Sequence, residues 1–145
     1  MTIPYEKAQT IVAAALAHGT ENGFKPLTVA VLDPGGALVA LGRQDGAAFL
    51  RPAVAQAKAS GILGLGMTSR QIGARAEADP AFFTALTTVA GGNVFPVQGG
   101  VFVHDAGGAL LGAVGITGDL SLNDEAAAVA GIEAAGLVAR TGAED

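Results

Sequence analysis

The chain has 145 residues, a length that fits one domain over 1–145 with a buried hydrophobic core. Its net charge is −5 and its basic residues are scattered, which argues against nucleic-acid binding because phosphate contacts need clustered lysines and arginines. No cysteine is present, which excludes disulfides, thiolate metal sites and cysteine nucleophiles. The N-terminal sequence lacks a signal-peptide pattern, and its apolar stretch over 11–17 is too short to cross a bilayer. We therefore expect a cytoplasmic protein with neither a nucleic-acid nor a membrane partner.

The first part of the chain is predicted to form a helix followed by a β-hairpin. Apolar residues recur at helical spacing between Tyr5 and Asn22, which predicts an amphipathic helix. Two strand-like runs follow over 27–32 and 38–41. The Asp-Pro-Gly-Gly sequence between them, 33–36, is typical of a tight turn because Pro presets φ and Gly permits positive φ.

The rest of the chain is predicted to contain further helices and a second hairpin. The expected helices span 51–66, 69–79, 81–89 and 123–140. The expected strands span 95–104 and 110–117, joined by Asp-Ala-Gly-Gly. Asn123 is the predicted N-cap of the last helix, and Asp124 and Glu125 complement the positive end of its dipole.

The two hairpins have related sequences, since 31–39 matches 103–111 at a constant offset. One sheet with two similar hairpins explains this correspondence without a duplicated half. We therefore predict an α+β fold with one antiparallel sheet of about four or five strands. The helices are expected to cover one face of this sheet, where the N-terminal and C-terminal helices pack together.

Three segments carry a resemblance to a known family. They are VLDPGGALVALGRQDGA at 31–47, AQAKAS at 55–60, and the long run at 99–134 that begins GGVFVHDAGG and includes the Asp-Glu pair. Together they resemble the GlcG/HbpS family, a profilin-like fold that also occurs as the C-terminal domain of PduO-type proteins. The likeness extends over 5–137. It implies a homo-oligomer that is often encoded beside catabolic genes. Several relatives bind haem, and others are linked to corrinoids or to redox sensing.

The sequence departs from the family pattern at two places. Relatives often carry Cys after the Asp-Glu pair, where this chain has Ala127, so a thiol-based redox role is excluded there. The Gly-Gly-x-Pro loop is also altered, because Gly91 and Gly92 stand apart from Pro96.

Two histidines are candidate ligands for haem iron. His18 lies on or beside the apolar face of the first predicted helix, and the resemblance implies a ligand in this region. The alternative is a histidine that interacts with the C-terminal end of the helix dipole. His104 directly precedes the turn at Asp105, where a solvated side chain is the alternative to a ligand. Of the two, the sequence favours His18 as the metal ligand.

A second cluster comprises Arg43, Asp45, Arg51 and Lys58. Arg43 ends a predicted strand, Asp45 begins a turn, and Arg51 and Lys58 follow on the next helix. Such a group could hold a carboxylate, either a haem propionate or a small organic acid, because a guanidinium binds carboxylates in a bidentate way. The alternative is a structural ion pair between Arg43 and Asp45, or one between helices at a subunit contact.

Two hypotheses of function follow, beside the simpler one of a structural oligomer without a ligand. In the first, the chain binds haem or a related tetrapyrrole. His18 would then coordinate the iron, and the basic cluster would lie near the propionates. In the second, it is an auxiliary enzyme for a small organic acid, whose carboxylate the basic cluster would orient. Asp45, His104 or Glu125 would then move protons.

Overall fold

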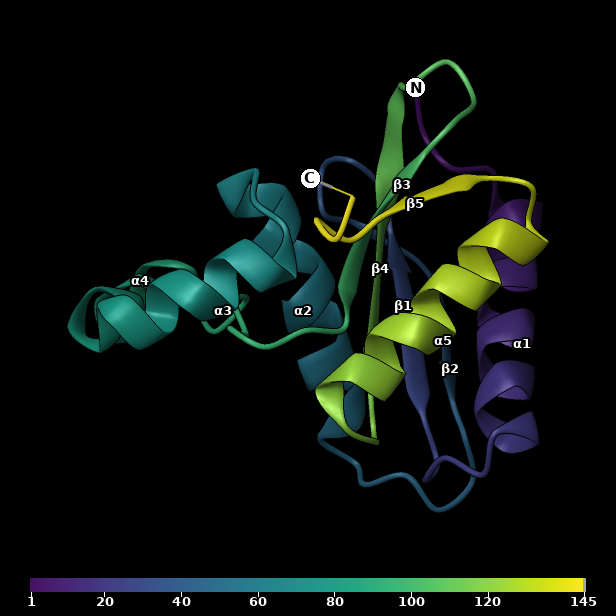
Figure 1. Ribbon diagram of the computed structural model, residues 1–145, viewed down its shortest axis with the longest axis horizontal. Coiled ribbons are helices and arrows are strands. Elements are labelled where there is room, and N and C mark those ends of the chain that lie inside the picture. The colour runs from purple at the N-terminus through teal and green to yellow at the C-terminus, as the bar shows by residue number, and fades with distance from the viewer. Residues whose placement is uncertain (145) are drawn as a thin grey trace.

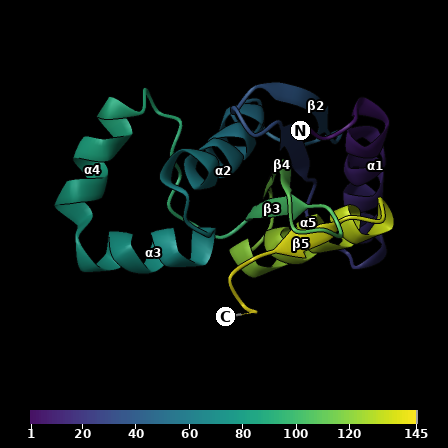
Figure 2. The same ribbon diagram turned by 90° about the horizontal axis from the view of Figure 1, so that it is seen from above.

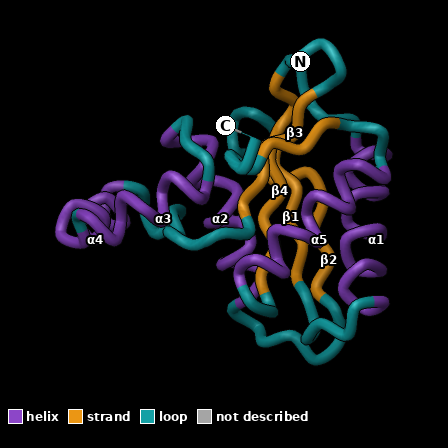
Figure 3. Tube along the Cα trace, in the orientation of Figure 1, coloured by secondary structure: helices purple, strands orange, loops and turns teal. Residues whose placement is uncertain are grey.

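The computed structural model describes residues 1–144, in which five helices surround a five-stranded sheet (Figures 1 and 3). The helices are α1 (Tyr5–Glu21), α2 (Arg51–Leu65), α3 (Ser69–Ala78), α4 (Pro80–Val89) and α5 (Ser121–Ala134). The strands are β1 (Thr28–Leu32), β2 (Leu38–Arg43), β3 (Gly100–His104), β4 (Leu110–Thr117) and β5 (Val138–Arg140). The predicted α+β class is confirmed. None of the described helices is long and apolar enough to span a membrane.

The sheet is antiparallel throughout and has the strand order β2-β1-β4-β3-β5. Both predicted hairpins are present. In each turn the aspartate holds the backbone: Asp33 Oδ1 accepts from the amides of Gly35 and Ala37 at 2.9 Å, and Asp105 Oδ1 accepts from Ala109 at 2.9 Å. The repeated Asp-x-Gly-Gly sequence therefore marks two equivalent turns of one sheet.

Helices cover both faces of the sheet, which corrects the expectation of one covered face. Helices α1 and α5 pack together on one face, as predicted, against the valines of β1 and β3. Helix α2 crosses the other face (Figure 2). Glycines permit this close crossing: a Cβ at Gly115 would lie 1.9 Å from the carbonyl oxygen of Ala55, and one at Gly100 would lie 2.6 Å from that of Lys58. Along β3 and β4, the valines thus face α1 and α5, and the alternating Gly100 and Gly115 face α2.

Three predicted boundaries are wrong. Helix α5 begins at Ser121, and its N-cap is Leu120 rather than the predicted Asn123. The side chain of Asn123 instead donates a hydrogen bond to Asp119. The same helix ends at Ala134, because Gly136 adopts a φ of 73° and turns the chain into β5. Strand β3 begins at Gly100 rather than at residue 95, which leaves the segment with Pro96 outside the sheet.

Helices α3 and α4 form an arm that stands away from the sheet (Figures 1 and 2). The arm is attached through a second hydrophobic cluster, in which Ile72 and Phe83 pack near Ile62 of α2 and Leu32 of β1. This cluster is separate from the core between the sheet, α1 and α5.

Candidate functional site

The predicted site residues lie at two opposite ends of the sheet. The lower end is defined by Thr28, Arg43 and Thr117, which are aligned across β1, β2 and β4. The upper end is defined by His104 and Leu110, where the hairpin of β3 and β4 turns. One protomer therefore does not bring His104 next to the basic cluster.

Lys58 is buried, with 3% of its side chain exposed. Its ammonium donates to the carbonyl oxygen of Ile116 at 2.8 Å and to Asp124 Oδ2 at 3.1 Å. Asp124 Oδ1 in turn accepts from the amide of Asp119 at 2.9 Å. Burial lowers the pKa of Lys58 and raises the pKa of Asp124, because both charged groups lose hydration. Lys58 thus joins α2, β4 and α5 inside the protein and does not reach the surface with the two arginines.

Arg43 and Arg51 lie at the lower end on the face covered by α2. Arg51 donates to Thr117 Oγ1 at 2.7 Å, and Arg43 donates to the carbonyl oxygen of Ala47 at 2.7 Å. Thr28 is aligned with both Arg43 and Thr117, and its buried hydroxyl has no hydrogen-bond partner among residues 1–144. Asp45 is exposed and makes no ion pair with Arg43 among the described residues. Two guanidiniums of the predicted cluster are therefore brought to one region.

His18 lies in the last turn of α1, at the lower end but on the opposite face from Arg51. Its ring is half-buried and meets the ring of Phe24 edge-on at 5.8 Å. The hydrogen bond from Gln44 to Thr20, at 3.1 Å, ties this turn to the end of β2. Within 1–144, neither ring nitrogen of His18 makes a hydrogen bond.

His104 lies at the upper end and lines an open cleft of about 420 Å³. In the pairing of β3 with β5, His104 is aligned with Val138 and Phe102 with Arg140, so these four side chains share one face. The remaining wall comes from the turn after β3 and from Glu144. The imidazole meets Phe102 edge-on at 6.2 Å, and its nitrogens form no hydrogen bond with any described residue.

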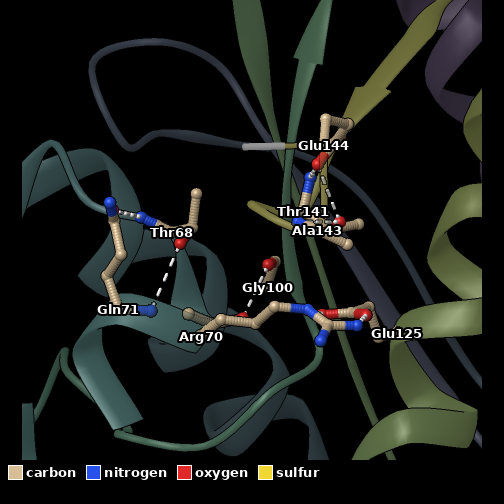
Figure 4. Close-up of polar contacts among 9 residues, drawn as sticks. Thr68, Arg70, Gln71, Gly100, Glu125, Thr141, Ala143 and Glu144 are labelled. Atoms are coloured by element: carbon tan, nitrogen blue, oxygen red, sulfur yellow. Dashed lines mark hydrogen bonds and ion pairs between the residues drawn. The ribbon is translucent and has the colours of Figure 1, made fainter. Parts of the chain in front are cut away.

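A polar junction that the sequence did not reveal joins the arm to the sheet and α5 (Figure 4). Arg70 binds the buried carboxylate of Glu125 through two nitrogens, its Nε at 3.2 Å, and this hydrogen bonding raises the pKa of Arg70. Ser69 donates to the carbonyl oxygen of Gly100 at 3.0 Å. Thr68 and Gln71 form a capping box at the start of α3. The only signal in the sequence is the Thr-x-x-Gln pattern of that box.

Residues 3–133 match the family model described as "Haem degrading protein HbpS-like". The chain belongs to this HbpS-like family. No curated protein sequence matches it.

Solved structures share the HbpS-like fold over nearly the whole chain. A crystal structure of a PduOC:haem complex has a TM-score of 0.83 at 20% identity and covers 95% of this chain and 98% of its own. The Klebsiella pneumoniae protein ORFY has a TM-score of 0.83 at 22% identity, covering 94% and 92%. A crystal structure of HbpS has a TM-score of 0.76 at 25% identity, covering 90% and 88%.

The residues of this HbpS-like chain fit a haem group in their donor chemistry. Neutral imidazole is a common axial ligand of haem iron, and the chain offers two imidazoles that form no hydrogen bond with any residue in 1–144, His18 and His104. Thiolate ligation of the iron is excluded, since the chain has no cysteine.

Proposed function

We propose that the chain binds haem or a related tetrapyrrole in the cleft beside His104. The observation that carries the proposal is an unbonded imidazole on the wall of a cleft of about 420 Å³. This volume lies in the usual range for small-molecule sites, about 300–1,000 Å³. His18, which the sequence favoured, is the second candidate iron ligand, and it packs against Phe24 on the α1 side.

The walls of the cleft suit an amphipathic ligand. Val138 and Ala139 offer apolar surface from β5, and Val138 is 48% exposed. Arg140 lines the same cleft and adds a cationic side chain to its wall. The carboxylates of Asp105 and Glu144 also line the cleft, where each accepts a hydrogen bond from the backbone of its own turn, from Ala109 and Thr141. Haem, when bound, supplies the iron that an imidazole can coordinate.

The comparisons support this ligand at the level of the family. The family model carries a haem-related description, and the chain shares its fold with PduOC, which has been solved with haem. Both observations favour a tetrapyrrole over an unrelated small molecule.

A hemin titration followed by the Soret band tests the proposal with a matched pair of variants. Val138 and Leu38 are 48% and 49% exposed on the two edge strands β5 and β2, and only Val138 lines the cleft. We expect saturable binding of about one hemin per chain, weakened roughly 10-fold or more in Val138→Asp because a carboxylate then faces the macrocycle and its propionates. Leu38→Asp should bind like the wild type. Binding that does not saturate, or that both substitutions weaken equally, would contradict the cleft as the site.

A small organic acid at the lower end is the second candidate ligand. The observation in its favour concerns the buried hydroxyl of Thr28, which has no hydrogen-bond partner in the described part of the chain. Thr28 is aligned with Arg43 and with Thr117, the residue to which Arg51 donates. A screen of hydroxy- and oxo-acids by thermal shift measures such binding, because a ligand of the folded state raises Tm. We expect any stabilising acid to lose its effect in Arg43→Gln. A screen in which no acid raises Tm would rule this second function out.

A further inference from the structure

After β5 the chain continues into a C-terminal segment, 141–144, that contributes to the cleft beside His104 and also contacts the arm. Glu144 lines the cleft. Gly142 lies against Thr68, the N-cap of α3: a Cβ at Gly142 would come 2.7 Å from Thr68 Oγ1 and 3.1 Å from Thr68 Cβ. Figure 4 shows the C-terminal segment next to the first turn of α3. One short segment therefore joins a wall of the cleft to the base of the arm.

Hydrogen bonds within the C-terminal segment fix its shape. The carboxylate of Glu144 accepts from the amide of Thr141 at 2.9 Å and from the hydroxyl of Thr141 at 3.1 Å. The hydroxyl oxygen of Thr141 in turn accepts from the amide of Ala143 at 3.0 Å. The segment is thus a closed turn, and a displacement of Gly142 is passed on to Glu144 on the wall of the cleft.

The first turn of α3 gives this segment a firm support. The Thr68 hydroxyl accepts from the amide of Gln71 at 3.2 Å in the capping box, so the side chain of Thr68 cannot rotate away without breaking the cap. Ser69 and Arg70 fasten the same turn to β3 and α5 through the hydrogen bonds described above. The contact with Gly142 is therefore made by a part of the arm that is itself held in place.

Charge also draws the C-terminal segment toward the arm. Hydrogen bonding to Glu125 contributes most to the raised pKa of Arg70, and the negative charge of Glu144 contributes as well. The guanidinium that ties α3 to α5 therefore also attracts a carboxylate on the wall of the cleft.

We propose that Thr68 and Arg70 are positioning residues for the cleft, and that they hold its C-terminal wall through Gly142 and Glu144. This inference rests on the proposed haem site beside His104. A wall that is held in place contacts the ligand and a displaced wall does not, so the ligand binds more weakly when the base of the arm is loosened. Linkage makes the effect mutual, since a ligand in the cleft must then hold the base of the arm more firmly.

A matched pair of glycine variants tests whether the wall depends on the arm. Gly142→Ala places a methyl group against Thr68, which its cap holds, so the C-terminal segment has to shift. Gly36, in the turn between β1 and β2, has nearly the same φ, 88° against 92°, and a Cβ there would have nothing within 4 Å. Gly36→Ala therefore carries a similar backbone strain without the collision. We expect Gly142→Ala to weaken hemin binding about 5-fold or more, and Gly36→Ala to bind hemin like the wild type.

Hydrogen exchange read by mass spectrometry tests the reverse direction in the unaltered protein. We expect saturating hemin to slow the exchange of the α3 amides about 5-fold or more, relative to the amides of α1, which lies far from the arm (Figure 2). Gly36→Ala should show the same slowing. In Gly142→Ala hemin should have little effect on α3, because the segment that connects the cleft to the arm is displaced.

The results distinguish a failure of this coupling from a failure of haem binding itself. Saturable hemin binding that Gly142→Ala leaves unchanged, or that Gly36→Ala weakens equally, would overturn the coupling and leave the haem site standing. Hemin that binds the wild type without slowing exchange in α3 would do the same. A wild type that binds no hemin saturably would overturn both proposals. Circular dichroism checks that the variants are folded, and if Gly142→Ala is not, the exchange measurement on the wild type decides alone.

Discussion

Removing one charge of the Lys58–Asp124 pair should destabilise the protein strongly. Asp124→Asn keeps the shape of the side chain and its bond from the Asp119 amide, but it leaves a lysine that is 3% exposed without a counter-charge. Breaking a buried ion pair in this way costs about 3–5 kcal/mol, a large part of the ~5–15 kcal/mol that stabilises a domain. With an unfolding entropy of about 2.1 cal/mol/K per residue, the 145-residue chain should lose roughly 10–16 °C in Tm.

A double-mutant cycle separates the pair from its surroundings. Burial is the largest influence on the pKa of both groups, which means that the lost hydration offsets much of their attraction. We therefore expect Lys58→Met combined with Asp124→Leu to cost less than Asp124→Asn alone. Urea unfolding followed by circular dichroism measures all variants. The reasoning is refuted if Asp124→Asn costs under about 1 kcal/mol, or if Lys58→Met and Asp124→Leu act additively.

Further substitutions test the packing, the acid stability and the arm. Gly115→Ala should cost about 1–3 kcal/mol or more in urea unfolding because its Cβ would overlap α2, whereas Gly64→Ala, with nothing within 4 Å, should gain about 0.5–1 kcal/mol. Hydrogen bonds from Asn123 and from backbone amides hold the pKa of Asp119 below its usual 3.8. The ionised carboxylate therefore stabilises the folded state above pH 3.8, and this stabilisation is lost as the pH falls through the lower pKa that Asp119 has in the folded protein. Asp119→Asn should accordingly be less stable than the wild type near neutral pH, and Tm scans against pH should show the gap narrowing in acid; a constant gap would contradict this. Arg70→Met leaves Glu125 buried without its partner, and limited proteolysis should then cut the arm faster than in the wild type.

Most of the fold could be predicted from the sequence, because turn residues and hydrophobic periodicity indicated the same helices and strands. The Asp-x-Gly-Gly turns set both hairpins, and helical periodicity identified α1. Strand β5 was missed because only three residues form it, and its pairing with β3 is a tertiary contact. The packing of α2 on the second face of the sheet was not predicted. The residues of β3 and β4 that face α2 include glycines, so the sequence shows no apolar alternation that would indicate a buried face there.

The candidate site was less predictable, since it depends on which ends of the strands meet. Arg43 and Arg51, which the sequence grouped together, lie at one end of the sheet. Lys58 was grouped with them, but its partner Asp124 is 66 residues away and no local pattern relates the two. His104 was a candidate from the sequence, but its cleft was not predictable, because β5 forms one wall of it.

The most direct test of haem binding at the cleft is the absorption spectrum of the hemin complex in His104→Ala and His18→Ala, each compared with the wild type. We predict that His104→Ala loses the Soret shift and the saturable binding, because it removes the imidazole that lines the cleft. His18→Ala should then retain both. A shift lost only in His18→Ala would move the site to the lower end of α1, and identical spectra in all three proteins would contradict histidine ligation altogether.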